Sequence, residues 1–338
     1  MNHTLTCTEP GHFQYSEDLA VQVAAGQSLL RIRRIGVCGT DLHAYEGTQP
    51  YFQYPRILGH ELAGELIGGD IPTGFHLGQA VTFIPYFHCG QCIACRSGRT
   101  NCCAQLQVFG VHIDGGMREQ VAVPSWSLIA GDGLSFEELA LVEPLAIGAH
   151  AVRRAQIQAG EYALVIGAGP IGLGIIEFAH LAGAKVIALD VNPARLDFCS
   201  QHTQAALVLN ARDPEVLEKI RDFTQGDMPT VVFDATGSLP AIQGAFAYMA
   251  HGARYILVGL QKGDISFSHP EFHKREGTLM SSRNATREDF ENVLHAMRSK
   301  QISPLQFITH RVGFAEAAEQ FPGWLKPEEL VVKAMIEV

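Results

Sequence analysis

Residues 162–174 read YALVIGAGPIGLG, and this stretch decides the fold of the second half of the chain. A continuous apolar run of buried-strand length leads directly into three glycines and then into an apolar helical pattern. In a strand–turn–helix setting, such glycines permit a tight turn, close approach of the backbone to a pyrophosphate, and packing of the helix on the strand. The pattern therefore predicts a dinucleotide site. The turn residues expected to bind the cofactor are Gly167, Gly169, Pro170, Ile171 and Gly172.

Strands and helices alternate on the C-terminal side of this turn. KVIALD (185–190), TVVFDAT (230–236) and ARYILVGL (253–260) are apolar runs of buried-strand length. Helix-like stretches, PARLDFCSQHT (193–203) and DPEVLEKIRDFTQ (213–225), lie between the first two of them. Regular alternation of this kind is typical of an α/β domain built on a doubly wound parallel sheet.

The residue at the end of the predicted strand KVIALD indicates which dinucleotide binds. Asp190 lies there at about the distance expected for a carboxylate that accepts hydrogen bonds from the adenosine ribose. Because a carboxylate repels a 2′-phosphate, NAD is favoured over NADP. Arg195 fits two interpretations equally well, a flank of the adenine or a solvated helix residue. Further cofactor contacts are expected at or just after strand ends, at Thr236, Val258, Gly259, Ser282 and Asn284.

The N-terminal part of the chain has a different texture. Its apolar runs, such as LLRIRRIGV (29–37) and AVTFIPYF (80–87), are short and interrupted by glycine and proline, which indicates irregular, mostly antiparallel β structure. The alternation fades from about Phe272, leaving one expected helix and a terminal strand pattern, LVVKAMIEV (330–338), that returns to the first domain. We therefore expect a discontinuous catalytic domain, residues 1–146 and 275–338, with the dinucleotide domain, residues 147–274, inserted.

Four cysteines form a first candidate metal site. Cys89, Cys92, Cys95 and Cys103 follow the spacing C-x2-C-x2-C-x7-C in a glycine-containing loop. Four thiolates so placed can surround a structural zinc tetrahedrally. An iron–sulfur cluster is less favoured, because its usual final spacing and following proline are absent, and unpaired thiols are the other alternative. The adjacent Cys102 makes the fourth ligand formally ambiguous, although the spacing favours Cys103.

A second set of residues predicts a catalytic zinc. The motifs GVCGTDLH (36–43), GHE (59–61) and VEPLA (142–146) supply one thiol, one imidazole and two carboxylates. Each motif alone is weak, but together they offer the ligand mix of a zinc site with an exchangeable position. Either carboxylate could bind directly, through water, or alternately. The candidate ligands are Cys38, His60, Glu61 and Glu143.

Composition limits the class of partner. The 338-residue chain has a formal net charge of -10, which argues against nucleic acid and anionic membranes, since both require a positive patch. The N-terminus, MNHTLTCTEP, lacks a signal-peptide pattern, and no apolar stretch has the length of a membrane span. We therefore expect a cytoplasmic protein with a small-molecule partner. Eight cysteines in such a chain favour metal ligation over disulfides.

Taken together and in this order, GVCGTDLH, GHExxG, the four-cysteine stretch, EPLA and GAGPIGL resemble the zinc-dependent medium-chain alcohol dehydrogenase superfamily over nearly the whole chain. The resemblance implies a GroES-like catalytic domain and a Rossmann domain, two zinc ions and NAD per subunit, and a homodimer or homotetramer. Glu143 is similar to the polyol and threonine dehydrogenase branch. SGRTNCC, GVHxDGG, HPEFHK and SRNAT resemble bacterial hexonate-oxidising enzymes of the L-galactonate type.

The resemblance implies roles for residues of the GVCGTDLH motif. Thr40 and His43 would relay a proton from the substrate hydroxyl to water, and an imidazole that titrates near neutrality suits the last step. The alternative is that His43 only caps a turn. Candidate providers for a substrate carboxylate are Arg118, His273, Lys274 and Arg283, and candidate cleft residues are Gln49, Phe52, His112 and Glu119.

We thus predict hydride transfer from a secondary alcohol of a sugar acid to NAD. The alternatives are a polyol or L-threonine dehydrogenase and, outside enzymes, a catalytically silent zinc- and nucleotide-binding protein. The presence of Cys38, Thr40, His43 and His60 together argues against the silent protein, since folding would not require all four.

Overall fold

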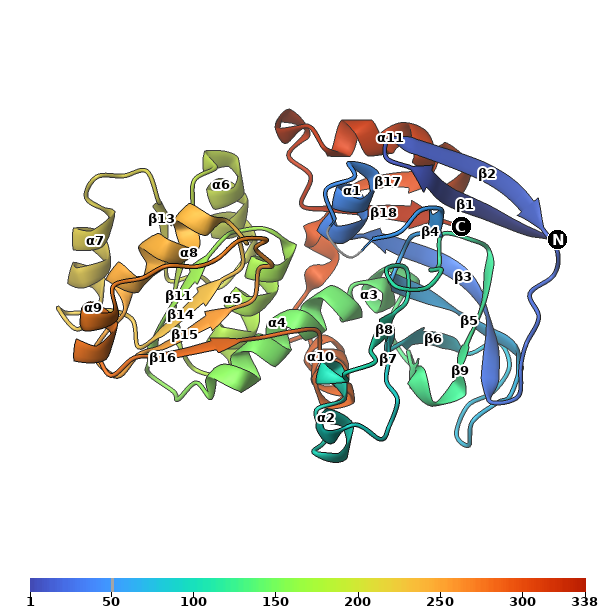
Figure 1. The fold of residues 1–338 in the computed structure, drawn as a ribbon, viewed down its shortest axis with the longest axis horizontal. Helices are drawn as coiled ribbons and strands as arrows, with labels where there is room; N and C mark the ends of the chain where they lie inside the picture. Colours follow the sequence, from blue (N-terminus) through green and yellow to red (C-terminus); the bar gives the residue numbers. More distant parts are fainter. Residues whose placement is uncertain (50–51) are drawn as a thin grey trace. The chain divides into compact units, whose positions relative to one another are not determined.

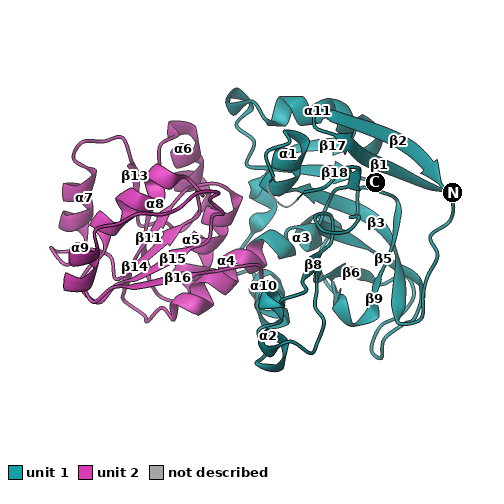
Figure 2. Cartoon of the chain, in the orientation of Figure 1, with its two compact units in different colours: residues 1–144, 286–338 teal, residues 145–285 magenta. Residues whose placement is uncertain are grey.

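The structure is a computed structural model that describes residues 1–49 and 52–338. It divides into two compact units, residues 1–144 with 286–338 and residues 145–285 (Figure 2). The sequence placed the two crossovers at 146/147 and 274/275. The second crossover lies later in the structure because strand β16 (Thr278–Ser281) still belongs to the sheet of the second unit.

The second unit contains a six-stranded parallel sheet with the order β13-β12-β11-β14-β15-β16 (Figure 1). The chain builds outward from β11 in one direction and then returns to build in the other, which confirms the doubly wound parallel sheet. The reversal lies between β11 and β14. The remaining bounds are β11 Tyr162–Ile166, β12 Lys185–Asp190, β13 Leu207–Asn210, β14 Val231–Asp234 and β15 Arg254–Leu257.

Helices cover this sheet: α5 packs on β11 and β12, α6 on β12 and β13, and α8 on β14. Local chemistry fixes where they begin. The side chain of Asn192 accepts hydrogen bonds from the backbone of Ala194 and Arg195 and so caps α6, which has Pro193 at its first position. The helix bounds are α4 Val142–Ala155, α5 Pro170–Leu181, α6 Pro193–His202, α7 Val216–Phe223, α8 Leu239–Ala245 and α9 His269–Lys274.

The first unit is mostly antiparallel β structure, as predicted. Its main sheet has the order β10-β6-β5-β3-β18-β17, and β9 also pairs with β3. A smaller sheet has the order β2-β1-β4, and β7 pairs with β8. The strand bounds are β1 Asn2–Glu9, β2 His12–Asp18, β3 Gln27–Val37, β4 Arg56–Ile57, β5 Glu61–Gly69, β6 Ala80–Phe83, β7 Tyr86–Phe87, β8 Gln107–Val108, β9 Gln120–Pro124, β10 Leu128–Ala130, β17 Ile308–Gly313 and β18 Lys333–Glu337.

The last strand brings the end of the chain back to its beginning. β18 runs antiparallel to β3, with Ala334 opposite Val37 and Ile336 opposite Ile35. The apolar residues on this strand are buried in the core of the first unit together with Leu30. The predicted return of the terminal strand is therefore confirmed. The helices of this unit are α1 Gly39–Tyr45, α2 Ile93–Arg96, α3 Phe136–Ala140, α10 Arg287–Arg298 and α11 Ala317–Trp324.

None of the helices within the described residues is long and apolar enough to cross a membrane.

A partly buried ion pair ties β11 to β15 in the second unit. Glu161 accepts hydrogen bonds from the backbone of Gln158 at 2.7 Å, from Thr230 Oγ1 at 2.8 Å, and from Arg254. Burial alone would raise the pKa of Glu161, but these donors hold it below its ordinary value. A lowered folded-state pKa means that the carboxylate stabilises the fold above its unfolded pKa and that this stability is lost as pH falls through the folded pKa.

We predict that Glu161→Gln lowers the free energy of unfolding by about 1–2 kcal/mol at pH 7, because a charge-assisted hydrogen bond is lost. The difference from the unsubstituted protein should shrink as the pH falls below 4. Urea unfolding followed by circular dichroism between pH 3.5 and 7 measures it. Glu218→Gln is the control, since that side chain is 63% exposed beside Arg221. An equal loss in both variants would contradict the prediction.

Candidate metal centres and dinucleotide site

The four cysteines predicted to bind the structural zinc lie together around one point. We call the loop that carries them, residues 89–103, the lobe. The Sγ atoms of Cys89, Cys92, Cys95 and Cys103 all lie within 4.8 Å of one another. The sulfur–sulfur distances are 3.5 Å for both Cys92–Cys95 and Cys89–Cys103. A tetrahedral zinc with bonds of about 2.3 Å would separate its sulfurs by about 3.8 Å, so the arrangement fits zinc.

Backbone N–H groups stabilise a negatively charged thiolate in this lobe. Hydrogen bonds from the backbone of Cys95 and Ala104 lower the pKa of the Cys92 thiol to about 6. The pKa of Cys95 is instead raised to about 12, by burial and by neighbouring thiols, so its proton would leave when a metal binds. Cys103 is buried within the lobe, whereas the adjacent Cys102 is exposed. The geometry therefore favours Cys103 as the fourth donor.

The second predicted cluster lies where β3 ends and β5 begins. Cys38 follows β3 and is the N-cap residue of α1, while His60 directly precedes β5 and Glu61 begins it. Donor atoms of these three residues lie within 4.8 Å of one another. Gly36 is opposite Glu61 in the β3–β5 pairing, and a side chain at that glycine would collide with the Glu61 carboxylate. The glycine therefore makes room for the carboxylate.

Asp41 organises this cluster and was not among the predicted residues. Its carboxylate accepts hydrogen bonds from the backbone of Cys38 at 2.9 Å and of Gly59 at 3.2 Å, and Oδ1 lies 3.8 Å from His60 Nδ1. Burial opposes a charged imidazole at His60, but Asp41 and then Cys38 outweigh it and raise its pKa well above the ordinary value. Nδ1 of His60 has no hydrogen-bond partner among the described residues, so Asp41 acts on the imidazole through its charge.

Glu61 is paired with a lysine that the sequence analysis also missed. Lys333 Nζ lies 2.6 and 2.7 Å from the two carboxylate oxygens of Glu61, and both side chains are at most 3% exposed. Lys333 also donates to the backbone oxygen of Val37 at 3.3 Å. Burial opposes the charge of this lysine, but Glu61 raises its pKa.

Glu143, at the start of α4, has a different environment. It is 2% exposed, and its Oε1 accepts a hydrogen bond from the hydroxyl of Tyr86. Its Oε2 is buried without a hydrogen-bond partner among the described residues. Burial raises the pKa of Glu143 to about 7, and the charge of Glu61 adds to the rise while His60 opposes it. A buried, unsatisfied carboxylate oxygen is costly unless a ligand completes it, so this cluster fits a divalent cation.

The two predicted relay residues lie on α1, next to Cys38. The side chain of His43 is 61% exposed, and its Nδ1 lies 3.3 Å from both Glu46 Oε2 and Thr48 Oγ1. Thr40 is half-buried. An exposed imidazole can exchange a proton with water, so the position suits the last member of a relay, which stays a prediction.

In the second unit, the glycine turn follows β11 as predicted. Gly167 has a φ of +103°, a conformation that favours glycine, and a side chain at Gly172 would collide with its carbonyl. A side chain at Gly169 would meet only Arg195, at 4.0 Å, which leaves the backbone open to a ligand. Asp190 Oδ2 accepts a hydrogen bond from the backbone of Ala168 at 2.7 Å, so the carboxylate at the end of β12 also holds the turn.

The remaining predicted cofactor residues follow β14, β15 and β16. A fully buried carboxylate, Asp234, accepts hydrogen bonds from the Thr236 hydroxyl at 2.5 Å and from the backbone of Gly237 at 3.1 Å. Its backbone oxygen accepts from Val258 and Gly259, both at 2.9 Å. Asp234 thus joins the loops after β14 and β15.

Two polar groups beyond β16 are unsatisfied. Ser282 Oγ and Asn284 Nδ2 are buried without a hydrogen-bond partner among the described residues, and Asn284 has a φ of +52°. Such groups suit a polar ligand at the carboxyl edge of the sheet. Their assignment to the cofactor stays a prediction.

Some of the proposed substrate residues already have protein partners. Glu119 accepts a hydrogen bond from the backbone of His3 at 3.0 Å, and Lys274 lies 3.8 Å from Glu271. Arg118 is half-buried and its Nε has no hydrogen-bond partner among the described residues, so it stays a candidate for a substrate carboxylate.

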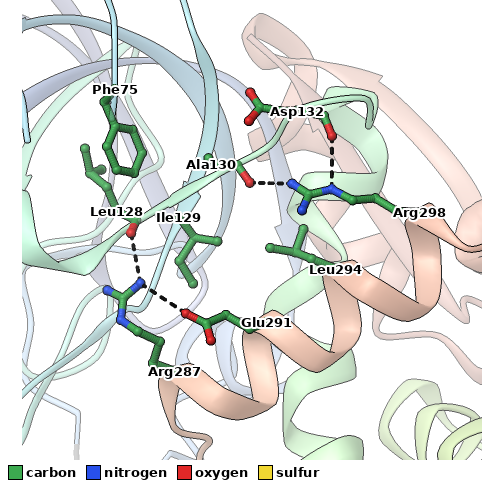
Figure 3. A pocket seen from close by; sticks show the side chains of 9 residues that line it. All are labelled: Phe75, Leu128, Ile129, Ala130, Asp132, Arg287, Glu291, Leu294 and Arg298. Carbon is green, nitrogen blue, oxygen red and sulfur yellow. Dashed lines mark hydrogen bonds and ion pairs between the residues drawn. The ribbon is translucent and has the colours of Figure 1, made fainter. Parts of the chain in front are cut away.

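A cavity of about 280 Å³ in the first unit lies between β10 and α10 (Figure 3). Arg298 donates to the backbone oxygens of Ala130 at 2.9 Å and Asp132 at 3.0 Å, and Arg287 donates to Leu128 at 3.2 Å. Both guanidinium groups thus fasten α10 to β10. The lining residues are Phe75, Leu128, Ile129, Ala130, Asp132, Arg287, Glu291, Leu294 and Arg298. None of them is a predicted site residue, and we interpret the cavity as a packing feature.

Comparisons with known proteins identify the family of the chain. Residues 24–132 match the family described as alcohol dehydrogenase GroES-like domain, and residues 170–299 match zinc-binding dehydrogenase. The chain is 43% identical to L-galactonate-5-dehydrogenase of Escherichia coli K12 over 94% of both proteins. It is 33% identical to a sorbitol dehydrogenase of Bacillus subtilis, over 69% of this chain and 67% of that protein.

A solved structure extends the similarity to three dimensions. An alcohol dehydrogenase of E. coli CFT073, described as a complex with NADH, superposes with a TM-score of 0.92 at 26% identity. The match covers 100% of this chain and 99% of that one.

We predict that Cys103→Ser removes one zinc ion per chain, because the lobe would lose one of four thiolates. Cys102→Ser is the matched control and should keep both ions, since Cys102 is exposed outside the group of donor atoms. Zinc content of the purified proteins by plasma mass spectrometry measures the difference. Loss of zinc from Cys102→Ser together with retention in Cys103→Ser would reverse the assignment.

Proposed function

The chain belongs to the zinc-type medium-chain alcohol dehydrogenases, and from this we propose that it oxidises a secondary alcohol of a sugar acid with NAD. As a member of this family it is a zinc-dependent, NAD-linked dehydrogenase that acts on CH–OH groups. The sugar acid is a hexonate of the L-galactonate type, supported by the 43% identity to L-galactonate-5-dehydrogenase over 94% of both chains.

The observation that carries the proposal is the group of donor atoms from Cys38, His60 and Glu61, which lie within 4.8 Å of one another, together with the buried Oε2 of Glu143, which has no hydrogen-bond partner among the described residues. A zinc ion held by these residues would lower the pKa of a substrate hydroxyl, and NAD would accept the hydride. The lobe cysteines would hold the second, structural zinc. The carboxylate of Asp41 lies 3.8 Å from His60 Nδ1, and Lys333 neutralises Glu61 in the same buried region.

The protein supplies proton transfer and cofactor recognition. The hydroxyl of Thr40 and the exposed imidazole of His43 pass the substrate proton to water. The backbone of the glycine turn would hold the pyrophosphate, and Asp190 would accept hydrogen bonds from the adenosine ribose and disfavour a 2′-phosphate. Thiolates that bind metal must stay reduced, so the proposal includes a cytoplasmic location.

Polyol oxidation is the second candidate, because the chain is also 33% identical to a sorbitol dehydrogenase. The metal and cofactor residues serve both reactions equally. The carboxylate of a hexonate would additionally require a cation or amide donors, for which Arg118 is a candidate.

We expect the zinc-loaded protein to reduce NAD with L-galactonate or a closely related hexonate at a kcat/KM at least about tenfold above that for sorbitol, xylitol or L-threonine, equivalent to about 1.4 kcal/mol of transition-state binding. Initial rates of NADH formation measure this, with NADP as the parallel cofactor. Preference for a polyol or threonine would overturn the sugar-acid substrate alone. Inactivity of a two-zinc protein on the whole panel would overturn the dehydrogenase reaction.

The same proposal includes self-association through β16. This strand is the last of the six-stranded sheet, and most of it is exposed, including Leu279 at 36%. An exposed edge strand carries unpaired backbone donors and acceptors that a second chain can pair with. A two-fold pairing of β16 with β16 of another copy would close that edge.

We expect light scattering to give a dimer or a tetramer for the unsubstituted protein and a smaller species for Leu279→Lys, because two lysines would meet across the paired edges. Leu19→Lys is the control at an apolar side chain that is 87% exposed on the first unit. A monomeric unsubstituted protein, or an unchanged assembly of Leu279→Lys, would contradict pairing through β16.

A further inference from the structure

The first unit buries two candidate carboxylate ligands, Glu61 and Glu143. The charged groups around them differ, and this difference would affect which of them binds the proposed catalytic zinc. Both oxygens of Glu61 lie within 2.7 Å of Lys333 Nζ. Zinc bonded to Glu61 would therefore lie close to a buried ammonium group, and the two cations would repel each other. Oε2 of Glu143 makes no hydrogen bond to a cation among the described residues, although the charges of His60 and Lys333 act on Glu143.

Tyr86 determines which oxygen of Glu143 is open. Its hydroxyl donates a hydrogen bond to Oε1, while Oε2 has no hydrogen-bond partner among the described residues. A neutral phenol has one hydrogen to donate, so it can engage only one of the two oxygens. The carboxylate is thus left with one satisfied and one unsatisfied oxygen.

The phenol itself is held rigidly. Tyr86 is 3% exposed, lies on β7 opposite Val108 of β8, and packs its ring edge-on against Phe290 of α10 with centroids 6.2 Å apart. Phe290 is fully buried. A hydroxyl on a ring so fixed cannot follow a rotating carboxylate, so the hydrogen bond restricts the carboxylate instead.

We propose that Tyr86 is a positioning residue for the catalytic metal, which holds Oε1 of Glu143 and presents Oε2 as a single-oxygen zinc ligand beside Cys38 and His60. The inference rests on the proposed function, because it assumes a zinc ion at that cluster. It assigns Glu143 to the metal and Glu61 to the ion pair with Lys333. A single-oxygen ligand leaves a coordination position for the substrate hydroxyl, whereas a two-oxygen carboxylate would fill it.

The test uses Tyr86→Phe, which removes the hydroxyl and keeps the ring that packs on Phe290. Tyr255→Phe is the matched control, since Tyr255 is fully buried in the second unit and donates to the backbone oxygen of Ile242 at 3.1 Å. Release of zinc to a chelator is followed for each protein. The lobe zinc serves as an internal reference in every sample.

We expect Tyr86→Phe to keep its lobe zinc and to bind the other ion about 10–100-fold more weakly, as for other residues that orient metal ligands. Tyr255→Phe should release both ions as the unsubstituted protein does. Replacement of zinc by Co²⁺ gives a second readout, because the visible absorption of Co²⁺ reports its ligand geometry. That spectrum should change in Tyr86→Phe, which a purely structural role for the tyrosine would not cause.

A double-substitution cycle with Glu143→Gln completes the test. If Tyr86 acts through Glu143, removal of the hydroxyl should add no further loss of zinc affinity in the Glu143→Gln background. Additive losses, or an unchanged affinity and Co²⁺ spectrum in Tyr86→Phe, would overturn the inference. An unsubstituted protein that binds only the lobe zinc would instead overturn the proposed function on which it rests.

Discussion

The architecture of the first unit depends on the burial of acidic groups that only a cation can balance. Asp41, Glu61 and Glu143 are each at most 2% exposed, and Lys333 forms an ion pair with Glu61. Buried charges cost several kcal/mol each unless they are paired or bound to a metal. Burial raises the pKa values of both Asp41 and Glu143, because the charged form of each carboxyl group is less stable in the protein interior than in water. A divalent ion beside Cys38 and His60 would relieve this cost.

Distant parts of the chain are needed to build this region. β3 and β5 bring Cys38 and Glu61 together, while β18 carries Lys333 back from the end of the chain to the same place. Tyr86 reaches Glu143 from a short strand, β7. The terminal segment is therefore part of the site. The segment that carries Lys333 follows the dinucleotide unit in the chain, so that unit is inserted between two parts of the first one.

The sequence predicts those features that local patterns encode. The spacing of Cys89, Cys92, Cys95 and Cys103 within one loop and the strand–turn–helix motif around Gly167 each lie within a short stretch, and the structure brings both together as expected. β16 was missed because its sequence, TLMS, forms no clear apolar run, and the short apolar run of β13, LVLN, was not singled out. The second domain boundary was consequently placed too early.

The supporting residues of the catalytic cluster could not be read in the same way. Lys333 lies 272 positions from Glu61 in sequence, and Tyr86 lies 57 positions from Glu143. A lysine in an apolar terminal strand was the one available signal, because a charge is rarely buried without a partner. Asp41 was within a recognised motif, and its hydrogen bond from Cys38 is the local capping contact of α1. Its hydrogen bond from Gly59 depends on a segment 18 positions away in sequence.

The central claim is that one chain holds two chemically different zinc ions, one bound by four thiolates and one by a single thiolate with nitrogen and oxygen. X-ray absorption at the zinc edge, combined with zinc quantification, measures this directly in the unsubstituted protein. The account predicts two ions per chain with about 2.5 sulfur neighbours on average, the mean of four and one. One ion per chain with about four sulfur neighbours would show that the Cys38 cluster holds no zinc, and would contradict the account.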